Sequence, residues 1–393
     1  MGTPISLFCT ECGRALDAGT KAWRCACGGS LGLVPPPSEA VRRTFNGLRL
    51  PPEPEARPRP QVWPRGFWRY GELLPIADLK GARAYDEGLT PLVPAWTDRP
   101  APPPWLKLDY LLPTGSYKDR GSAVMINRLR ELGVAALIED SSGNAGASVA
   151  TYAARNSLGC TIFAPAGASR GKLAQIAQTG ARLVTVGGAR ERAAEAALKA
   201  AGTAYYAGHN VNPYFLAGVK TWAYEVFEQC GGVAPDDCVF PVGGGSLLVG
   251  ADLGFRDLLG AALIDRLPRL WAVQAEPCAP VVKAFELGLD APEPVEKGPT
   301  VAEGIALARP PRGVDVLAAI RRTGGGAIAV PDEDILPAAE RIASLGFFVE
   351  PTSAAAWLGY ERLVAAGRLV AGATIVVALT GSGLKYTDWP VEH

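Results

Sequence analysis

Residues 239–250 read Val-Phe-Pro-Val-Gly-Gly-Gly-Ser-Leu-Leu-Val-Gly, a short apolar run that ends in a glycine turn before a second apolar run begins. The first run, 239–242, predicts a buried strand, and the second predicts a helix that starts at Leu247. The turn between them, Gly243 to Ser246, joins the strand directly to the helix. Such strand–turn–helix units are typical of α/β folds.

The same alternation of short apolar runs and Ala-rich amphipathic stretches runs from Trp105 onward. Further buried strands are predicted at 135–138, 161–163, 183–186, 270–273 and 374–379. Helices are predicted at 145–156, 171–178, 189–201 and 337–345. This pattern indicates parallel sheets covered by helices on both faces. Ligands bind beyond the carboxyl ends of strands in such folds, so the turns that follow the strands are where a site is expected.

Length and charge limit the classes of protein that the chain can belong to. It has 393 residues, of which 48% are hydrophobic, and 39 basic side chains balance 39 acidic ones. Two or three domains with a large core are therefore expected. The balanced charge gives no electrostatic reason to expect nucleic acid or an anionic membrane as a partner. No apolar run reaches the ~20 residues that span a bilayer, and the first residues lack the pattern of a signal peptide, so we expect a cytoplasmic protein.

The N-terminal region carries a cysteine pattern that is typical of a metal site. Four thiols have the spacing Cys-x-x-Cys…Cys-x-Cys, at Cys9, Cys12, Cys25 and Cys27. Four thiolates suit tetrahedral zinc in a small ribbon that could not otherwise bury enough surface. Since protein would fill every ligand position, the zinc is expected to be structural. The alternative is that four reduced thiols bind no metal.

A proline-rich stretch follows the cysteines. Residues 35–65 include Pro35-Pro36-Pro37, Pro51-Pro52 and the run Arg57-Pro58-Arg59-Pro60. Proline fixes φ and cannot donate a backbone hydrogen bond, which prevents regular pairing. The composition therefore predicts an extended connector.

The turn from Gly243 to Ser246 has the properties of an anion site. Successive glycines allow backbone N–H groups to crowd around an anion, and the helix dipole and the Ser246 hydroxyl add to the attraction. A phosphate would fit there, although a tight connection without a ligand explains the turn equally well. The turn lacks the Gly-Lys-Ser/Thr ending of a nucleotide P-loop, and no convincing dinucleotide fingerprint occurs elsewhere, so ATP and NAD are not expected.

Lys118 lies in the stretch Pro-Thr-Gly-Ser-Tyr-Lys-Asp-Arg-Gly, residues 113–121, ahead of an apolar helix predicted at 123–132. Most lysines are solvated surface charges, and without its sequence context Lys118 would be interpreted as one of them. However, the helix start carries a partial positive charge and Arg120 adds a full one. This field would favour a neutral, nucleophilic amine, which is what Schiff-base chemistry needs.

Taken together, these segments resemble a known family. PTGSYKDRG from Pro113, SSGNAGAS from Ser141, GGGS from Gly243, EPTSA from Glu350 and LTGSGLK from Leu379 resemble, in this order, the motifs of fold-type II pyridoxal phosphate enzymes. The threonine synthase-like branch is the most similar. GFWRYGELLP at 66–75, GLTPLVPA at 88–95, VNP at 211–213 and the cysteine-rich start extend the resemblance to nearly the whole chain.

The resemblance implies a fold and a division into domains. The fold would be α/β, with two doubly wound parallel-sheet domains of the tryptophan synthase beta-like kind and a small N-terminal zinc ribbon. The ribbon would span 1–34 and the connector 35–65. A large cofactor-binding domain would combine 66–125 with 215–393, and a small α/β domain would span 126–214.

The resemblance also implies how pyridoxal 5'-phosphate would be bound. Lys118 would bind it as a Schiff base and later move protons at the substrate. Asn144 would hydrogen-bond the ring hydroxyl, and Thr380 would offer its hydroxyl to the ring nitrogen. The phosphate would be held by the backbone of Gly243, Gly244, Gly245 and Ser246. A neutral hydroxyl does not enforce ring protonation as an aspartate would, so elimination and replacement gain over transamination.

Further residues receive roles around the substrate. Ser116, Ser141 and Ser142 would lie near the carboxylate of a small amino acid, since the turn before the helix at 145 presents N–H groups and hydroxyls to an anion. A simple helix cap is the alternative for Ser142 and Asn144. We expect Asp119 to be a structural partner of its helix start and His209 to be a loop or packing residue.

The leading activity implied is that of threonine synthase, which converts O-phosphohomoserine and water to threonine and phosphate. Three departures from the family pattern leave the substrate open: Leu112 replaces an asparagine, Tyr117 a phenylalanine and Ser142 a threonine. AEGIA from Ala302 is also similar to serine/threonine dehydratases and β-replacing enzymes. A binding homologue without catalysis is a further alternative, against which the retention of Lys118 and Asn144 argues. A homodimer is the family expectation.

Overall fold

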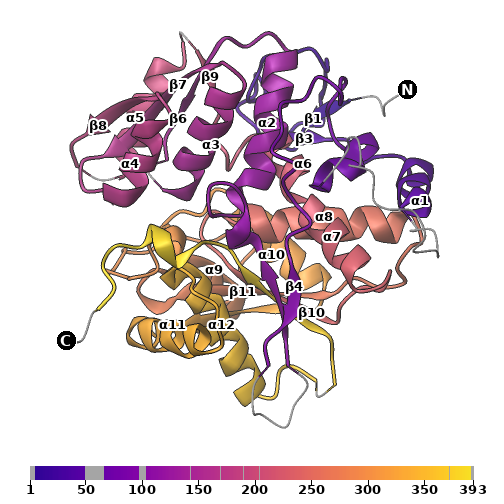
Figure 1. The fold of residues 1–393 in the computed structure, drawn as a ribbon, viewed down its shortest axis with the longest axis vertical. Helices are drawn as coiled ribbons and strands as arrows, with labels where there is room; N and C mark the ends of the chain where they lie inside the picture. The colour runs from indigo at the N-terminus through magenta and orange to yellow at the C-terminus, as the bar shows by residue number, and fades with distance from the viewer. Residues whose placement is uncertain are drawn as a thin grey trace, which may run out of the picture.

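The computed structural model describes residues 5–48, 66–96, 103–141, 143–168, 170–188, 190–202, 204–370 and 372–390. The strands in this part of the chain form a three-stranded, a four-stranded and a six-stranded sheet. Figure 1 shows the four-stranded sheet at the upper left, the three-stranded sheet at the upper right and the six-stranded sheet below them. The two parallel sheets predicted from the sequence are therefore present.

The three-stranded sheet belongs to the cysteine-rich start. Its strands β1 (Leu7–Cys9), β2 (Ala15–Leu16) and β3 (Leu31–Leu33) pair antiparallel in the order β2-β1-β3. Its interior is small, with Cys9, Cys25 and Leu31 forming a separate buried cluster. A core of this size cannot hold a fold alone, so a cross-link such as a metal would add substantially to its stability.

The stretch after the ribbon differs from the prediction. The sequence predicts an extended connector over 35–65, but residues Ser38–Gly47 form helix α1. The reason is local: no proline follows Pro37 until Pro51, and Val41 and Phe45 are buried on one face of the helix. The Phe45 ring packs 5.6 Å from that of Tyr70. The rest of the predicted connector, 49–65, lies outside the described residues.

The four-stranded sheet is entirely parallel. Strands β6 (Ala136–Glu139), β7 (Gly159–Pro165), β8 (Arg182–Val186) and β9 (Tyr205–Tyr206) lie in the order β8-β7-β6-β9. The helices around it are α3 (Asn144–Arg155), α4 (Arg170–Gln178) and α5 (Arg190–Ala200). Neighbouring residues of β6 face opposite ways: Leu137 joins the main core, whereas Ile138 packs in a separate cluster with Ala193 of α5. Both faces are thus covered, as predicted.

The six-stranded sheet has the order β12-β11-β10-β13-β5-β4, and only the β4–β5 pair is antiparallel. Its strands are β4 (Leu92–Pro94), β5 (Trp105–Leu108), β10 (Asp237–Pro241), β11 (Arg269–Ala275), β12 (Gly326–Val330) and β13 (Ile375–Leu379). Along β13, Val376 joins one hydrophobic cluster and Val377 the other, which is the alternation of a sheet buried on both faces.

Helices cover both faces of this sheet. One cluster contains side chains of α8 (Ser246–Gly260), α9 (Pro280–Glu286) and α10 (Gly313–Arg322). The other contains those of α11 (Ile335–Ser344) and α12 (Pro351–Ala365), which lie at the lower left in Figure 1. The 3-10 turns are η1 (Gly66–Leu73), η2 (Asp109–Leu111), η3 (Glu276–Cys278), η4 (Glu303–Ile305), η5 (Asp332–Asp334) and η6 (Gly383–Lys385).

Three helices connect the two parallel sheets. They are α2 (Lys118–Glu131), α6 (Pro213–Val219) and α7 (Thr221–Gln229). Helices α2 and α6 approach so closely that a Cβ at Gly218 would overlap the carbonyl oxygen of Arg120. This contact fixes the first turn of α2, which begins at Lys118.

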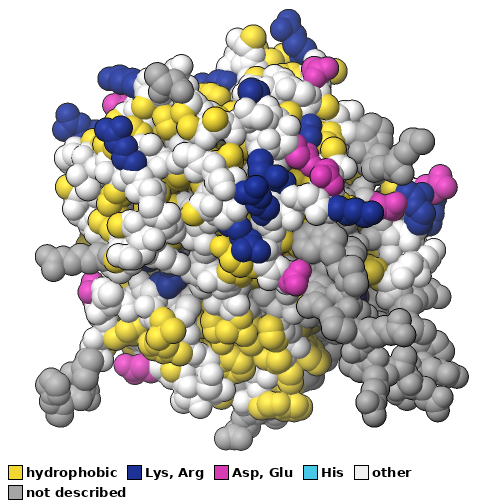
Figure 2. Space-filling view, turned by 45° about the horizontal axis from the view of Figure 1, so that its top comes forward, with side chains coloured by type: hydrophobic (Ala, Val, Ile, Leu, Met, Phe, Trp, Pro, Cys, Tyr) yellow, Lys and Arg dark blue, Asp and Glu magenta, His cyan; other side chains and the backbone are white. Residues whose placement is uncertain are grey.

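Two surface properties bear on partners. Among the described residues, no helix is both long and apolar enough to cross a membrane. Figure 2 shows basic and acidic side chains scattered together over one face, with hydrophobic side chains gathered towards its lower edge. The net charge of the whole chain is +0, and on this face side chains of both signs occur.

Candidate active site

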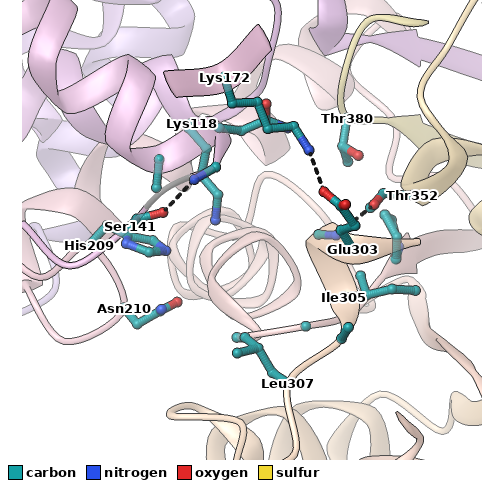
Figure 3. Close-up of a pocket in the computed structure, with 18 of the residues that line it drawn as sticks. Lys118, Ser141, Lys172, His209, Asn210, Glu303, Ile305, Leu307, Thr352 and Thr380 are labelled. Carbon is teal, nitrogen blue, oxygen red and sulfur yellow. Dashed lines mark hydrogen bonds and ion pairs between the residues drawn. The ribbon is translucent and has the colours of Figure 1, made fainter. Parts of the chain in front are cut away.

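The carboxyl ends of strands from both parallel sheets meet at a cavity of about 280 Å³. Strand β6 leads into Ser141 and Asn144, β10 leads into the glycine turn, and β13 leads into Thr380. Lys118, at the start of α2, lines the same cavity, and Figure 3 shows its amine pointing into it. The site thus lies where a doubly wound fold places its ligands.

The Lys118 amine is held by a tyrosine hydroxyl. Its Nζ donates to Tyr117 Oη at 2.6 Å, and that oxygen lies 3.1 Å from Ser246 Oγ. Nζ also lies 4.5 Å from the centroid of the Tyr117 ring and 5.9 Å from that of Phe215. The amine is therefore tied to the same turn that begins α8.

Arg120 does not act on Lys118 as the sequence suggests. Its guanidinium is buried and pairs with Asp109 at 2.8 Å and with Glu225 at 2.7 Å, while Lys107 pairs with the other Glu225 oxygen at 2.8 Å. Burial alone would raise the pKa of Glu225, but Arg120 and Lys107 outweigh it and lower the pKa to about 2. Because two carboxylates neutralise its charge, Arg120 anchors the start of α2 and does not activate the amine.

Asp119 is structural, as expected. Its carboxylate accepts hydrogen bonds from the Thr114 backbone N–H at 2.7 Å, the Thr114 hydroxyl at 2.6 Å and the Ser148 hydroxyl at 2.6 Å. Complete burial raises its pKa. The residue joins the turn before Lys118 to helix α3.

The glycine turn leaves no space for side chains. A Cβ at Gly243 would lie 2.7 Å from the Gly304 carbonyl oxygen, and one at Gly245 would lie 2.6 Å from Val316. Gly245 also has φ +92°, which disfavours other residues. No side chain of the described residues caps α8, so the N–H groups of its first turn are available to an anion in the cavity. The Ser246 side chain is buried and does not line the cavity.

The first turn of α12 holds two of the predicted residues. Asn144 Nδ2 donates to both Glu350 oxygens, at 2.9 and 3.1 Å, and its buried Oδ1 has no hydrogen-bond partner among the described residues. Ser353 Oγ accepts from the backbone N–H of Thr380 at 2.9 Å and lies 3.2 Å from the Thr380 hydroxyl. Glu350 therefore holds Asn144, and Ser353 holds Thr380, at the wall of the same cavity.

The three predicted serines are placed differently. Ser141 lines the cavity, and its hydroxyl accepts from the Gly143 N–H at 3.4 Å. Ser116 is buried, forms a backbone bridge with Gly381 and does not line the cavity. Ser142 lies outside the described residues.

Several cavity residues were not found from the sequence. Lys172 of α4 and Glu303 of η4 form an ion pair of 3.2 Å, drawn as a dashed line in Figure 3. His209 also lines the cavity; its Nδ1 lies 2.7 Å from Glu139 and its ring packs on Phe215, so it combines packing with a place in the wall. Glu303 lies in the AEGIA segment that the sequence singled out, whereas no sequence motif included Lys172.

A separate group of ligand atoms occurs in the ribbon. Its sulfur atoms all lie within 4.8 Å of one another and belong to Cys9, Cys12, Cys25 and Cys27. The backbone N–H groups of Cys12 and Glu11 point at Cys9 Sγ from 3.5 and 3.4 Å and lower the pKa of that thiol to about 6. Four sulfur atoms grouped in this way are suited to tetrahedral zinc.

Comparisons with known proteins agree with this geometry. The family described as "Pyridoxal-phosphate dependent enzyme" matches residues 84–381. The threonine synthase of Methanocaldococcus jannaschii is 33% identical over 386 residues, covering 97% of this chain and 93% of its own. That of Mycobacterium tuberculosis strain H37Rv is 34% identical over 334 residues, covering 84% of this chain and 90% of its own. Threonine deaminase isoform 2 from Solanum lycopersicum has the same fold, with a TM-score of 0.65 at 21% identity, covering 75% of this chain and 79% of its own.

The cavity residues fit the cofactor of that family. Lys118 supplies an amine, the uncapped start of α8 supplies a place for a phosphate, and Asn144 has a buried amide oxygen without a partner among the described residues. Both the family match and the relatives cover more than two thirds of the chain. The chain belongs to the pyridoxal-phosphate dependent enzymes and is a relative of the threonine synthases.

Proposed function

We propose that this enzyme is a threonine synthase, which converts O-phosphohomoserine and water to threonine and phosphate. The observation that carries the proposal is the meeting of Lys118, Asn144, the glycine turn and Thr380 in one cavity, in a chain whose relatives of similar length are named threonine synthase. When bound, pyridoxal phosphate supplies an electron sink that makes protons on nearby substrate carbons acidic.

Each cavity residue has a defined task in this proposal. Lys118 Nζ would hold the cofactor covalently and, when free, would take and return protons at the substrate Cα and Cβ. The N–H groups at Gly243 to Ser246 would bind the cofactor phosphate. Asn144 would hydrogen-bond the ring hydroxyl, and Thr380 Oγ1 would serve the ring nitrogen. Ser141, with the helix start beside it, binds the substrate carboxylate.

Lys172 supplies a site for the second anionic group of the substrate. Its side chain is 9% exposed, whereas that of its partner Glu303 is 53% exposed. A substrate phosphate entering the cavity can therefore replace Glu303 beside the Lys172 ammonium and form a charge-assisted hydrogen bond. Serine and threonine carry no phosphate and gain nothing from this lysine, so it favours the synthase over a dehydratase.

The test is a product assay on the purified holoenzyme. With O-phosphohomoserine we expect release of phosphate and formation of threonine in equal amounts. With serine or threonine we expect little keto acid, and Lys118→Ala should be inactive with every substrate. Keto acid from serine or threonine without phosphate release from O-phosphohomoserine would instead identify a dehydratase. Loss of O-acetyl or similar groups from a serine derivative would identify a β-replacing enzyme.

We also propose the domain division expected from the sequence: a ribbon at 1–34, a connector at 35–65, a large domain of 66–125 with 215–393, and a small domain at 126–214. It is supported by the separation of the three sheets along the chain, since the four-stranded sheet falls within 136–206. The ribbon would hold one structural zinc on its four cysteines. The enzyme would be a cytoplasmic homodimer. Light scattering in solution measures the mass of the particle and so tests the dimer.

A further inference from the structure

The hydroxyl of Tyr117 lies between two groups of the site. Its oxygen is 2.6 Å from Lys118 Nζ and 3.1 Å from Ser246 Oγ, the first residue of α8. Tyr117 itself lines the cavity, and its ring lies under the amine, 4.5 Å from Nζ. The hydroxyl therefore contacts the reacting nitrogen on one side and the phosphate turn on the other.

Phenylalanine would offer the same ring at this position without the oxygen. The contacts of Tyr117 Oη are with two polar groups of the site, Lys118 Nζ and Ser246 Oγ. What the oxygen adds is thus confined to the hydrogen bonds of the lysine and the serine.

We propose that Tyr117 is a catalytic residue that serves the free Lys118 amine in both of its protonation states. When Nζ is protonated, it donates to Tyr117 Oη, and the phenol proton turns to Ser246 Oγ. When Nζ is neutral, the phenol proton turns back and is donated to the nitrogen lone pair. The proton that Nζ gains or loses is exchanged with the substrate carbon, whereas the Tyr117 O–H bond stays intact and only rotates.

This arrangement has a consequence for the steps in which Lys118 is free. Nζ keeps a hydrogen-bond partner whether it has just received a proton or has just given one up. The amine therefore stays in place in the cavity. A free lysine without such a partner would explore other rotamers before reacting. The inference rests on the proposed use of Lys118 but not on the identity of the substrate.

Covalent attachment of pyridoxal phosphate to the apoprotein tests the proposal, with the rate followed by absorbance and the site mapped after borohydride trapping. Tyr117→Phe should slow attachment at Lys118 roughly tenfold or more, the factor expected from losing one hydrogen bond to a charged group. Its thermal unfolding should stay unchanged because the ring is kept. Tyr110→Phe, which removes the hydroxyl of a tyrosine outside the cavity lining, should attach at the wild-type rate.

A double-mutant cycle separates proton handling from packing. Ser246→Ala should slow attachment less than Tyr117→Phe does, and it should have no further effect in the Tyr117→Phe background, since the serine acts through the tyrosine. Wild-type rates for Tyr117→Phe, or fully additive effects of the two substitutions, would overturn the proposal. If the wild-type protein attaches the cofactor to Lys118 but makes no threonine, the proposed function fails while the role of Tyr117 is still decided by these rates. Absence of attachment at Lys118 would overturn both.

Discussion

Glu350 determines how Asn144 is presented to the cavity. The carboxylate is buried and accepts both hydrogen bonds from the Asn144 amide nitrogen, which fixes the orientation of the amide. A carboxylate has only acceptors, so the Asn144 nitrogen faces Glu350. The Asn144 Oδ1, which has no hydrogen-bond partner among the described residues, is thereby kept for another group.

Glu350→Gln tests this positioning role. Glutamine brings a donor as well as an acceptor, so the amide of Asn144 loses its fixed orientation. We expect the dissociation constant of pyridoxal phosphate to rise roughly tenfold, about the cost of one misaligned hydrogen bond, and the absorption band of the bound cofactor to shift. The matched control is Glu340→Gln on the exposed face of α11. An unchanged dissociation constant and spectrum would remove Glu350 from the site.

Glu87 makes stability depend on pH. Burial raises the pKa of its carboxyl from 4.5 to about 7. The folded protein therefore retains this proton up to about pH 7, whereas the unfolded chain releases it near 4.5. The resulting stabilisation is fully present below pH 4.5 and is lost as the pH rises through 7.

Glu87→Gln cannot ionise and should remove this dependence. The melting temperature of the variant minus that of the wild type should be several degrees larger at pH 8 than at pH 5. Thermal unfolding of both proteins at the two pH values measures the difference. If the gap between the two melting temperatures is the same at pH 5 and pH 8, the carboxyl is not titrating as described.

Among the elements, the ribbon packs on the rest of the molecule through apolar and polar contacts. Leu7 of β1 belongs to the main hydrophobic core, and β3 packs on α6. Trp23 packs edge-on against Tyr206 of β9 at 4.7 Å, and Arg128 of α2 donates to the Ala18 carbonyl at 2.7 Å. The ribbon's own separate interior is small and is centred on the cysteine cluster.

Cys9→Ser should abolish zinc binding and unfold the ribbon. We expect metal analysis to find one zinc per wild-type chain and none in the variant, and the ribbon of the variant to be cleaved first in limited proteolysis. Cys160→Ser, which alters a cysteine outside the cluster, should retain the metal. A wild-type protein without zinc, together with equal protease resistance of all three proteins, would show that the thiols bind no metal.

Some elements were predictable because their environment is uniform. Strand β13 is buried on both faces, so it is a continuous apolar run that the sequence reveals. Strand β5 was missed because it contains Lys107, a charge that reads as surface although Glu225 pairs with it in the interior. Helix α12 was missed because its buried residues surround the helix and leave little amphipathic period.

The candidate site likewise contains residues that the sequence predicted and residues that it missed. Asn144 and the glycine turn follow strands β6 and β10, and Lys118 was singled out by the resemblance of its segment to a family motif. The cavity brings all three together. Lys172 and Glu303 are 131 residues apart and meet only because the two parallel sheets face each other across the cavity. No local pattern announces such a pair, and the sequence could not predict it.

At the scale of the whole molecule, the site depends on both parallel sheets. Ser141 and Asn144 lie beyond the carboxyl end of β6 in the four-stranded sheet. The glycine turn and Thr380 lie beyond the carboxyl ends of β10 and β13 in the six-stranded sheet. The Lys172–Glu303 ion pair joins the two sides at the cavity. A substrate that occupies the cavity therefore contacts both halves at once.

Lys172→Met tests whether this bridge recognises a substrate phosphate. We expect KM for O-phosphohomoserine to rise at least tenfold, because a charge-assisted hydrogen bond is lost, while the rate of cofactor attachment is unchanged. Lys199→Met, on the exposed face of α5, is the matched control. An unaltered KM would assign the substrate phosphate to another part of the cavity.

In the proposed enzyme Lys118 carries pyridoxal phosphate. Borohydride reduction of the holoenzyme followed by peptide mass analysis identifies the lysine that holds the cofactor. The structure predicts that the added cofactor mass falls on the peptide that contains Lys118 and is absent from Lys118→Ala. Modification of Lys172, Lys297 or Lys385 in place of Lys118, or an unmodified protein, would contradict the account.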